Sequence, residues 1–473
     1  MIFQSFQFLT FFLVVLFGAR IVLGKFPELR KLFLLVASYF FYMCWDWRFG
    51  GLILAITFIN YYIGPKIQDA EDDGAKKRWL ALSLIISIAI LAYFKYANFF
   101  IDSMNDLLTL LGFSVNIPLL NVLLPIGISF YTFQSISYTL DIYRGRTEAV
   151  KSFSDFALFV AFFPQLVAGP IVRASHFLPQ LKNDHKEEPD SMETGVALMI
   201  RGFIKKVAFA DVLAVHFVDP AFANPELYSP IFLLVAIYAY SYQVYMDFSG
   251  YTDIARGVAR TLGYELQINF NRPYQAVSVS NFWQRWHISM SSFFRDYLFF
   301  GIGGSRYGNV YFNLMVTFVA IGIWHGAGWN FVLYGILHGT FVGLERWRRN
   351  KRAAEGISEP EYHGIRLAAQ WFWIFNVVAF SRLLFRGGSL DSAIHYAKAM
   401  THFEVTSLPV NMVGGAIFVL AFILHYTPLN WTYGWKSLYC RIPVVIQSGL
   451  IVGVLYFLVA ISTTEAPFIY FQF

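Results

Sequence analysis

Two histidines, His287 and His325, stand in stretches where an imidazole needs an explanation. His325 ends an apolar run in the segment Gly-Ile-Trp-His-Gly-Ala-Gly, residues 322–328. A polar side chain within such a run indicates function by default, but a histidine that hydrogen-bonds across a helix interface fits equally well. An imidazole has a pKa near neutrality, so it can take a proton from a hydroxyl group. The residues alone leave both interpretations of His325 open.

His287 lies in a stretch, 269–306, that lacks the pattern of a plain membrane helix. Aromatic residues recur there at helical spacing after an expected helix start at Ser280: Phe282, Trp286, Phe293 and Tyr297. Arg285 and Arg295 would be costly at the centre of a bilayer. We therefore expect an amphipathic helix at the membrane interface, which by composition alone would also suit a simple anchor.

Asp247, Ser249 and Asp253 surround Gly250 just after another apolar run. The simpler interpretation is a helix that ends near Gly250, followed by a second helix with a Ser or Asp cap. The alternative is a set of polar groups inside the membrane that contacts a substrate.

No metal site is expected. Cys44 and Cys440 are far apart and have no ligand or redox spacing, so a buried thiol is the expected role of both. His338 would lie about 220° round an unbroken helix from His325, which favours a packing role for His338.

The composition indicates which kind of secondary structure must position these residues. Of 473 residues, 57% are hydrophobic, 19% aromatic and only 14% charged, whereas a soluble domain carries roughly 25% charged residues. Disorder, a collagen-like fibre and a disulfide scaffold are excluded. Apolar runs near the ~20 residues that a spanning helix needs predict about 11 to 13 membrane segments. Because lipid offers no hydrogen bonds to the backbone, we expect an all-α polytopic membrane protein.

The charges indicate topology. The strongest basic cluster, residues 345–352, is expected in the cytoplasm by the positive-inside rule. The formal net charge of +6 is scattered between apolar runs, so no nucleic-acid partner is expected. The first apolar run lacks a basic region before it and is expected to be a span and not a cleaved signal. No internal repeat is evident, which counts against an inverted-repeat transporter.

Several motifs match a known family. The run from Phe282 to Ser289, Phe-Trp-Gln-Arg-Trp-His-Ile-Ser, is followed by Trp324-His-Gly326. Together they resemble the membrane-bound O-acyltransferases, and within them the bacterial alginate O-acetyltransferase subgroup. Further matches to the subgroup are Tyr93-Phe-Lys-Tyr96, the run from Leu124 to Phe130, Pro164 to Pro170, the run from Asp247 to Tyr251, and Pro467 to Phe473. The teichoic-acid D-alanyl transferases share both histidine motifs.

The resemblance implies one membrane domain over 1–473: a ring of about 11 tilted transmembrane helices around a central funnel. Residues 269–306 would then be re-entrant or interfacial cytoplasmic helices that line the donor entrance, and 463–473 an aromatic tail that docks near the site, binds a partner or anchors at the interface. It makes His325 the principal catalytic histidine and His287 the second. The expected donor and substrate contacts, inferred from position and charge, are Trp324, Trp286, Trp283, Arg285, Arg295, Asp247, Ser249 and Asn269.

The resemblance also implies an activity. We expect transfer of an acetyl group from cytosolic acetyl-CoA, a substrate and not a bound cofactor, towards an exported polysaccharide such as alginate. The protein would lie in the bacterial inner membrane, with the donor site facing the cytoplasm, the acceptor facing the periplasm, and lipid and periplasmic or membrane-anchored acetyltransferases as partners. D-alanyl transfer from a carrier protein and, in another class, a transporter with a histidine relay are the alternatives.

Overall fold

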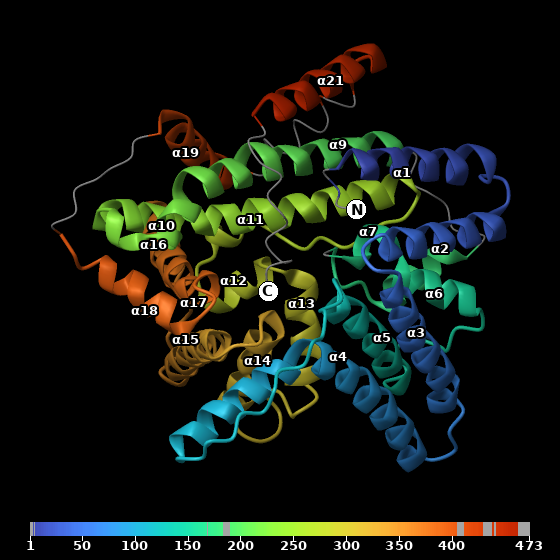
Figure 1. Ribbon diagram of the computed structural model, residues 1–473, viewed down its shortest axis with the longest axis horizontal. Coiled ribbons are helices and arrows are strands. Elements are labelled where there is room, and N and C mark those ends of the chain that lie inside the picture. Colours follow the sequence, from blue (N-terminus) through green and yellow to red (C-terminus); the bar gives the residue numbers. More distant parts are fainter. Residues whose placement is uncertain are drawn as a thin grey trace. The chain divides into compact units, whose positions relative to one another are not determined.

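The computed structural model describes residues 3, 5–167, 169–182, 190–403, 411–428, 438 and 441–461. Within these residues every regular element is a helix, as the coiled ribbons of Figure 1 show. The all-helical expectation is confirmed for this part of the chain. The tail at 463–473 and Cys440 lie outside it.

The chain divides into two compact units. Unit one comprises residues 1–196 and 255–267, and unit two comprises residues 197–254 and 268–473. Helices α9 (Ser191–Phe203) and α11 (Pro230–Thr261) contribute residues to both. The other helices of unit one are α1 (Phe6–Phe17), η1 (Gly18–Val22), α2 (Pro27–Met43), α3 (Trp47–Gln68), α4 (Asp73–Leu110), α5 (Ile128–Tyr143), α6 (Phe153–Ala161), α7 (Phe163–Leu166), α8 (Ala174–Phe177) and η2 (Leu178–Leu181).

A buried polar cluster joins three helices of unit one. Ser83 of α4 donates a hydrogen bond of 2.7 Å to Asn60 of α3 and lies 3.0 Å from the Thr139 hydroxyl of α5. Asn60 also donates to Ser87, at 3.2 Å. All four side chains are buried. Hydrogen bonds of this kind between helices are typical of bundles in membranes, where the hydrophobic effect does not drive helix association.

Unit two holds the stretches that the sequence singles out. Its helices, besides its part of α9 and α11, are η3 (Ile204–Asp211), η4 (Ala214–Val218), α10 (Asp219–Ala223), η5 (Pro225–Leu227), η6 (Pro273–Gln275), α12 (Val279–Arg285), α13 (Ile288–Phe293), η7 (Phe294–Phe299), α14 (Val310–His325), α15 (Trp329–Ala354), α16 (Gly364–Ser381), α17 (Leu383–Arg386), α18 (Leu390–Ala399), α19 (Met412–Tyr426) and α21 (Val444–Ile461).

Three helical stretches among the described residues are long and apolar enough to cross a membrane: Asp73–Leu110, Pro230–Thr261 and Gly364–Arg386. Three shorter helices are also apolar, Phe6–Val22, Val310–His325 and Met412–Tyr426. These helices support a membrane protein. The count of about 11 spans in a ring stays a prediction.

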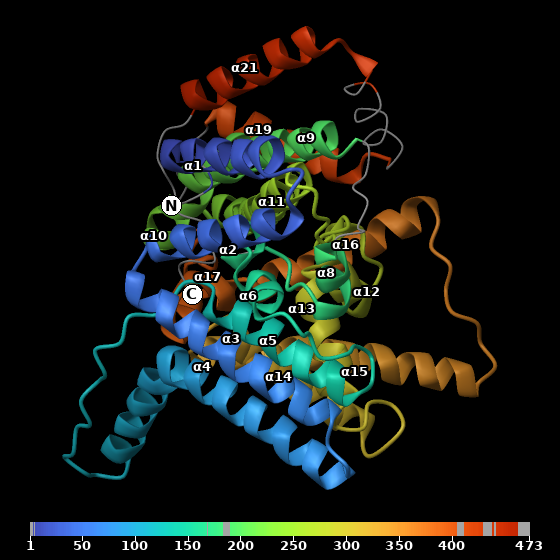
Figure 2. The ribbon, with the colours of Figure 1, turned by 90° about the vertical axis from the view of Figure 1, so that its right-hand side faces the viewer.

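Helices α14 and α15 form a tight hairpin because glycines face each other across it. A Cβ at Gly322 of α14 would collide with the Phe331 carbonyl oxygen, and one at Gly335 of α15 with the Phe318 carbonyl oxygen. Small residues allow two helix backbones to approach this closely. In Figure 2 the ends of α15 and α16 that segment 355–363 connects extend together to the right of the view. His325, the last residue of α14, is at the opposite end of the hairpin.

We expect Gly322→Ala to disturb the hairpin, because the obstacle is a backbone atom that cannot rotate away. Overpacking of this kind costs about 1–3 kcal/mol, and the shift would reach His325 one helical turn later. The measurement is the thermal unfolding midpoint in nanodiscs. Gly343→Ala is the control, since a Cβ there would lie 3.8 Å from Tyr311, an ordinary contact. Equal midpoints for the two variants would contradict the expectation.

Two expectations are wrong in this part of the chain. Cys44, expected to be buried, is exposed, because it caps α2 in the short connection to α3. The expected helix end near Gly250 does not occur, because α11 continues through Gly250 to Thr261.

Candidate active site

His325 is a buried residue at the end of a helix. Only 3% of its surface is exposed, and α14 ends at it because the extended Gly326 leads into the turn before α15. Three aromatic side chains surround the ring: Trp324 and Phe385, each 5.2 Å away between centroids, and Tyr334, at 6.1 Å. The imidazole therefore lies in an aromatic enclosure from which water is largely excluded.

His287 lies at a break between two short helices. The continuous helix expected after Ser280 is wrong: α12 starts after its cap Ser278 and ends at Arg285, and α13 starts at Ile288. His287 itself adopts a left-handed backbone conformation, with φ 44° and ψ 54°, which is uncommon for a residue other than glycine. The side chain is completely buried.

Asn269 holds this break in place. Its backbone oxygen accepts a hydrogen bond from the Ile288 N–H at 2.9 Å, and its side-chain oxygen accepts two from Ser289, at 3.1 Å from the N–H and 2.9 Å from the hydroxyl. The same oxygen lies 3.3 Å from His287 Nδ1. Because an amide oxygen can only accept, we assign the proton to Nδ1 and the lone pair to Nε2. Burial lowers the pKa of His287 to about 3, so the ring is neutral.

Trp324 connects the two histidines. Its ring lies 5.5 Å from the His287 ring and 5.2 Å from the His325 ring, with interplanar angles of 70° and 69°. Phe248 of α11 completes the enclosure of His287 at 4.7 Å. The two motifs that are distant in the sequence are thus brought to the same indole.

The other two predicted tryptophans are buried close to this centre. Trp286 stacks on Phe282, with 5.6 Å between ring centroids. Trp283 donates its indole N–H to His338 at 3.2 Å, and the other nitrogen of His338 lies 3.0 Å from the Ser381 hydroxyl. His338 is therefore a hydrogen-bonded packing residue, as the sequence predicts.

The predicted arginines differ in their surroundings. Arg285 is half-buried and donates to Asn281 at 2.9 Å. Arg295 is exposed and pairs with its neighbour Asp296 at 2.8 Å. The paired carboxylate offsets the charge of Arg295, so Arg285 is the better candidate for attracting an anionic donor.

Asp247 and Ser249 are buried within α11, Asp247 forms an ion pair there, and the expected substrate contacts of both stay predictions. Lys206 of η3 pairs with Asp247 and with Asp211, both at 2.8 Å. Further along α11, Asp253 pairs with Arg201 at 2.6 Å and Lys205 at 2.7 Å. These ion pairs allow the carboxylates to lie inside a continuous helix. Phe248, which follows Asp247, contacts His287.

Sequence reasoning did not single out Tyr334, Phe385 or Arg382. The two aromatic residues surround His325, and Arg382 contacts Trp286. A charge near the end of an apolar run was the only sequence signal for Arg382. Among the residues that the structure describes, no group of three or more His, Cys, Asp and Glu side chains is arranged to hold a metal.

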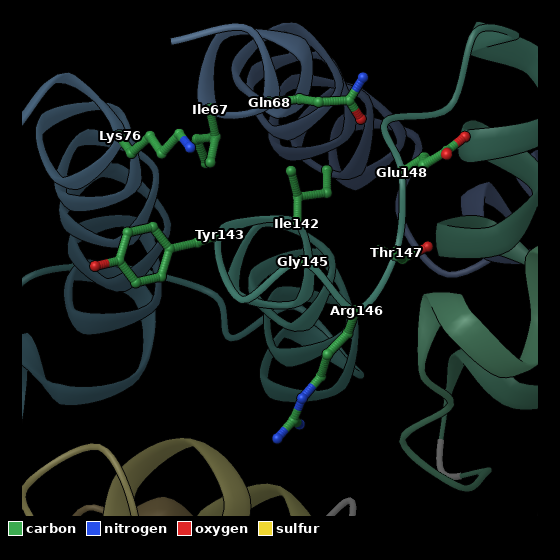
Figure 3. Close-up of a pocket in the computed structure, with 9 residues that line it drawn as sticks. All are labelled: Ile67, Gln68, Lys76, Ile142, Tyr143, Gly145, Arg146, Thr147 and Glu148. Atoms are coloured by element: carbon green, nitrogen blue, oxygen red, sulfur yellow. The ribbon is translucent and has the colours of Figure 1, made fainter. Parts of the chain in front are cut away.

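Unit one contains a separate cavity of about 540 Å³. Figure 3 shows the nine residues that line it, among them Lys76, Arg146 and Glu148; the Arg146 side chain extends away from the other labelled residues. Arg146 lies 3.8 Å from Asp141. None of the predicted site residues lines this cavity.

Comparison with known proteins identifies the chain. Residues 148–385, which include both histidines, match the model of the membrane-bound O-acyltransferase family. The chain is 40% identical to the probable alginate O-acetylase AlgI of Azotobacter vinelandii, over 93% of this chain and 86% of the relative. It is 34% identical to the peptidoglycan O-acetyltransferase of Helicobacter pylori, over 86% and 81%. A teichoic acid D-alanyltransferase of Streptococcus thermophilus is 28% identical over 55% and 68%.

The apolar helices and the matched sequence together define an integral-membrane acyltransferase. The chain belongs to the membrane-bound O-acyltransferase family, and it is an O-acyltransferase. The transporter alternative is therefore set aside.

Proposed function

We propose that the protein moves an acetyl group from cytosolic acetyl-CoA to an exported polysaccharide, alginate or a similar polymer, with His325 as the general base. The observation that carries the proposal is the arrangement around Trp324, which brings two buried histidines to one indole. The relatives named as alginate O-acetylases and peptidoglycan O-acetyltransferase support acetyl as the transferred group.

The reaction requires a hydroxyl oxygen to attack a thioester carbonyl. In the proposed mechanism His325 takes the hydroxyl proton during the attack, and the tetrahedral intermediate then expels the CoA thiolate, which receives that proton. General-base catalysis of this kind contributes ~10² to 10⁴ in rate. The aromatic enclosure of His325 would limit access of water, which would otherwise hydrolyse the thioester.

His287 has a different proposed role. With its proton on Nδ1 towards Asn269, the ring presents a lone pair at Nε2. It can accept a hydrogen bond from a substrate but cannot donate one from Nε2 to a carbonyl. His287 therefore orients the donor and does not polarise the carbonyl.

The proposed orientation follows from charge. The basic cluster at 345–352 lies at the end of α15, and the axial rise from Trp329 to Arg346 is about 26 Å, close to the ~30 Å thickness of a hydrocarbon core. With this cluster in the cytoplasm of a bacterial inner-membrane protein, His325 lies towards the acceptor side. We also propose that the donor enters past residues 269–306. The expected partner is a periplasmic or membrane-anchored acetyltransferase.

The test is release of CoA from acetyl-CoA by the purified protein in nanodiscs, with and without a candidate acceptor. We expect release that increases with the acceptor, and radiolabel from the acetyl group in the acceptor. A second assay supplies a D-alanyl carrier protein as the donor. It tests the alternative of D-alanyl transfer, which the D-alanyltransferase relative suggests. Transfer from the carrier and none from acetyl-CoA would overturn the proposed donor.

A further inference from the structure

Arg382 is a buried cation that has no carboxylate partner among the residues that the structure describes. It is 4% exposed. One guanidinium nitrogen donates to the Tyr274 hydroxyl at 3.2 Å, and the guanidinium carbon lies 4.5 Å from the Trp286 ring centroid. The buried Nε–H makes no hydrogen bond within the described residues.

Several other cations of unit two are paired with carboxylates. Lys206 contacts two aspartates, Lys205 contacts Asp253, and Arg386, one turn after Arg382, contacts Asp219 at 2.9 Å. Burying one ion carries a large desolvation penalty, and a cation–π contact returns only part of it. Trp286 and Tyr274 therefore offset only part of the cost of burying Arg382. An anion bound to the guanidinium would offset the remaining cost of burying the charge.

Arg382 is also near residues that belong to both histidine motifs or contact them. Its guanidinium carbon lies over the ring of Trp286, the residue before His287. Phe385, three residues later on the same helical face, contacts His325. Ser381, the preceding residue, lies 3.0 Å from His338. The guanidinium thus contacts the residue that precedes His287, and it lies one helical turn from Phe385, which contacts His325.

The position along α16 indicates which substrate carries the anion. The candidate span Gly364–Arg386 begins after the basic cluster at 345–352, and Arg382 is about 27 Å further along the helix axis. Under the proposed function, on which this inference rests, that end faces the acceptor. A guanidinium can bind a planar carboxylate through two parallel N–H groups.

We propose that Arg382 is the binding residue for an anionic group of the acceptor, a carboxylate of the uronate type, held beside the two histidines. It would fix the sugar so that its hydroxyl reaches His325. Arg382 thereby determines specificity for acidic over neutral polymers.

The test is ligand binding, measured by the thermal unfolding midpoint of the full-length protein in nanodiscs. The probes are a short oligouronate, a neutral oligosaccharide of the same length, and CoA. We expect the oligouronate to raise the wild-type midpoint more than the neutral sugar does. Arg382→Met should weaken oligouronate binding about 10- to 100-fold, the range for a charged hydrogen-bonded pair, and Arg386→Gln should bind as the wild type does.

The unliganded variant gives a second readout. Because an apolar side chain of similar size replaces an uncompensated buried charge, Arg382→Met should unfold at or above the wild-type temperature. Arg382→Lys, which keeps the charge but not the planar fork, should bind with intermediate affinity. If Arg382→Met does not fold, Arg382→Lys replaces it in the binding test.

Three outcomes would overturn the proposal. If the oligouronate raises the wild-type unfolding midpoint no more than the neutral sugar does, the protein has no anion site. Weakened CoA binding with unchanged oligouronate binding assigns Arg382 to the donor. A lower unfolding temperature with both affinities unchanged makes it a packing residue. Binding needs no thioester chemistry, so these outcomes are independent of whether acetyl-CoA proves to be the donor.

Discussion

Replacing His325 with alanine is expected to lower acetyl-CoA-dependent CoA release by ~10² to 10⁴-fold at equal amounts of folded protein, the range for loss of a general base. The ring is buried within contact distance of Trp324, Tyr334 and Phe385. Its removal leaves the backbone turn at Gly326 unchanged, so the chemical step should suffer more than the fold. His325→Gln, which keeps hydrogen-bonding capacity but cannot take the proton, should be equally impaired.

The control for His325→Ala is the loss of another buried histidine. His338 is hydrogen-bonded to Trp283 and Ser381, so His338→Ala should lower the unfolding midpoint and retain most of the turnover per folded molecule. Added imidazole should restore part of the activity of His325→Ala and none of that lost in His338→Ala. Turnover by His325→Ala within tenfold of wild type would contradict the assignment of the base.

Lys206→Met is expected to destabilise the protein by about 3–5 kcal/mol, the cost of removing one partner from a buried ion pair. Lys206 is 6% exposed and contacts Asp211 and Asp247, both at 2.8 Å. The substitution keeps the side-chain volume but leaves two carboxylates without their shared cation. The measurement is the shift of the unfolding midpoint in nanodiscs.

Lys205→Met is the matched comparison, because Asp253 keeps its contact with Arg201 at 2.6 Å. We expect a much smaller loss for that variant. The double variant Lys206→Met/Asp247→Leu removes one of the stranded carboxylates and should recover part of the stability. Equal losses in the two lysine variants, or no recovery in the double variant, would contradict this account of the ion pairs.

Composition predicted the all-helical membrane class, because that feature depends on the local sequence, and the catalytic roles of His287 and His325 stay predictions. The break at His287 was not predictable in the same way. The aromatic spacing from Phe282 to Tyr297 favours one helix, but Asn269, distant in the sequence, hydrogen-bonds to Ser289 and lies beside the His287 ring. A long-range contact thus overrides a local helical pattern.

The same physical reason explains the error at Gly250. Gly250 and the possible caps around it, Ser249 and Asp253, suggest that one helix ends and another begins. Lys206 and Arg201, from another segment, neutralise Asp247 and Asp253 and let α11 continue. The position of Arg382 was also not predictable, because its contact with Trp286 joins segments that are distant in the sequence.

The indole of Trp324 contacts both histidine rings, so we expect the effects of substitutions in the two motifs to be coupled. Substitutions at 287 and 325 should show epistasis that vanishes when residue 324 is changed first. Any search for variants with a new acyl donor should therefore randomise these three positions jointly, because a library that varies one motif at a time will miss the compatible combinations.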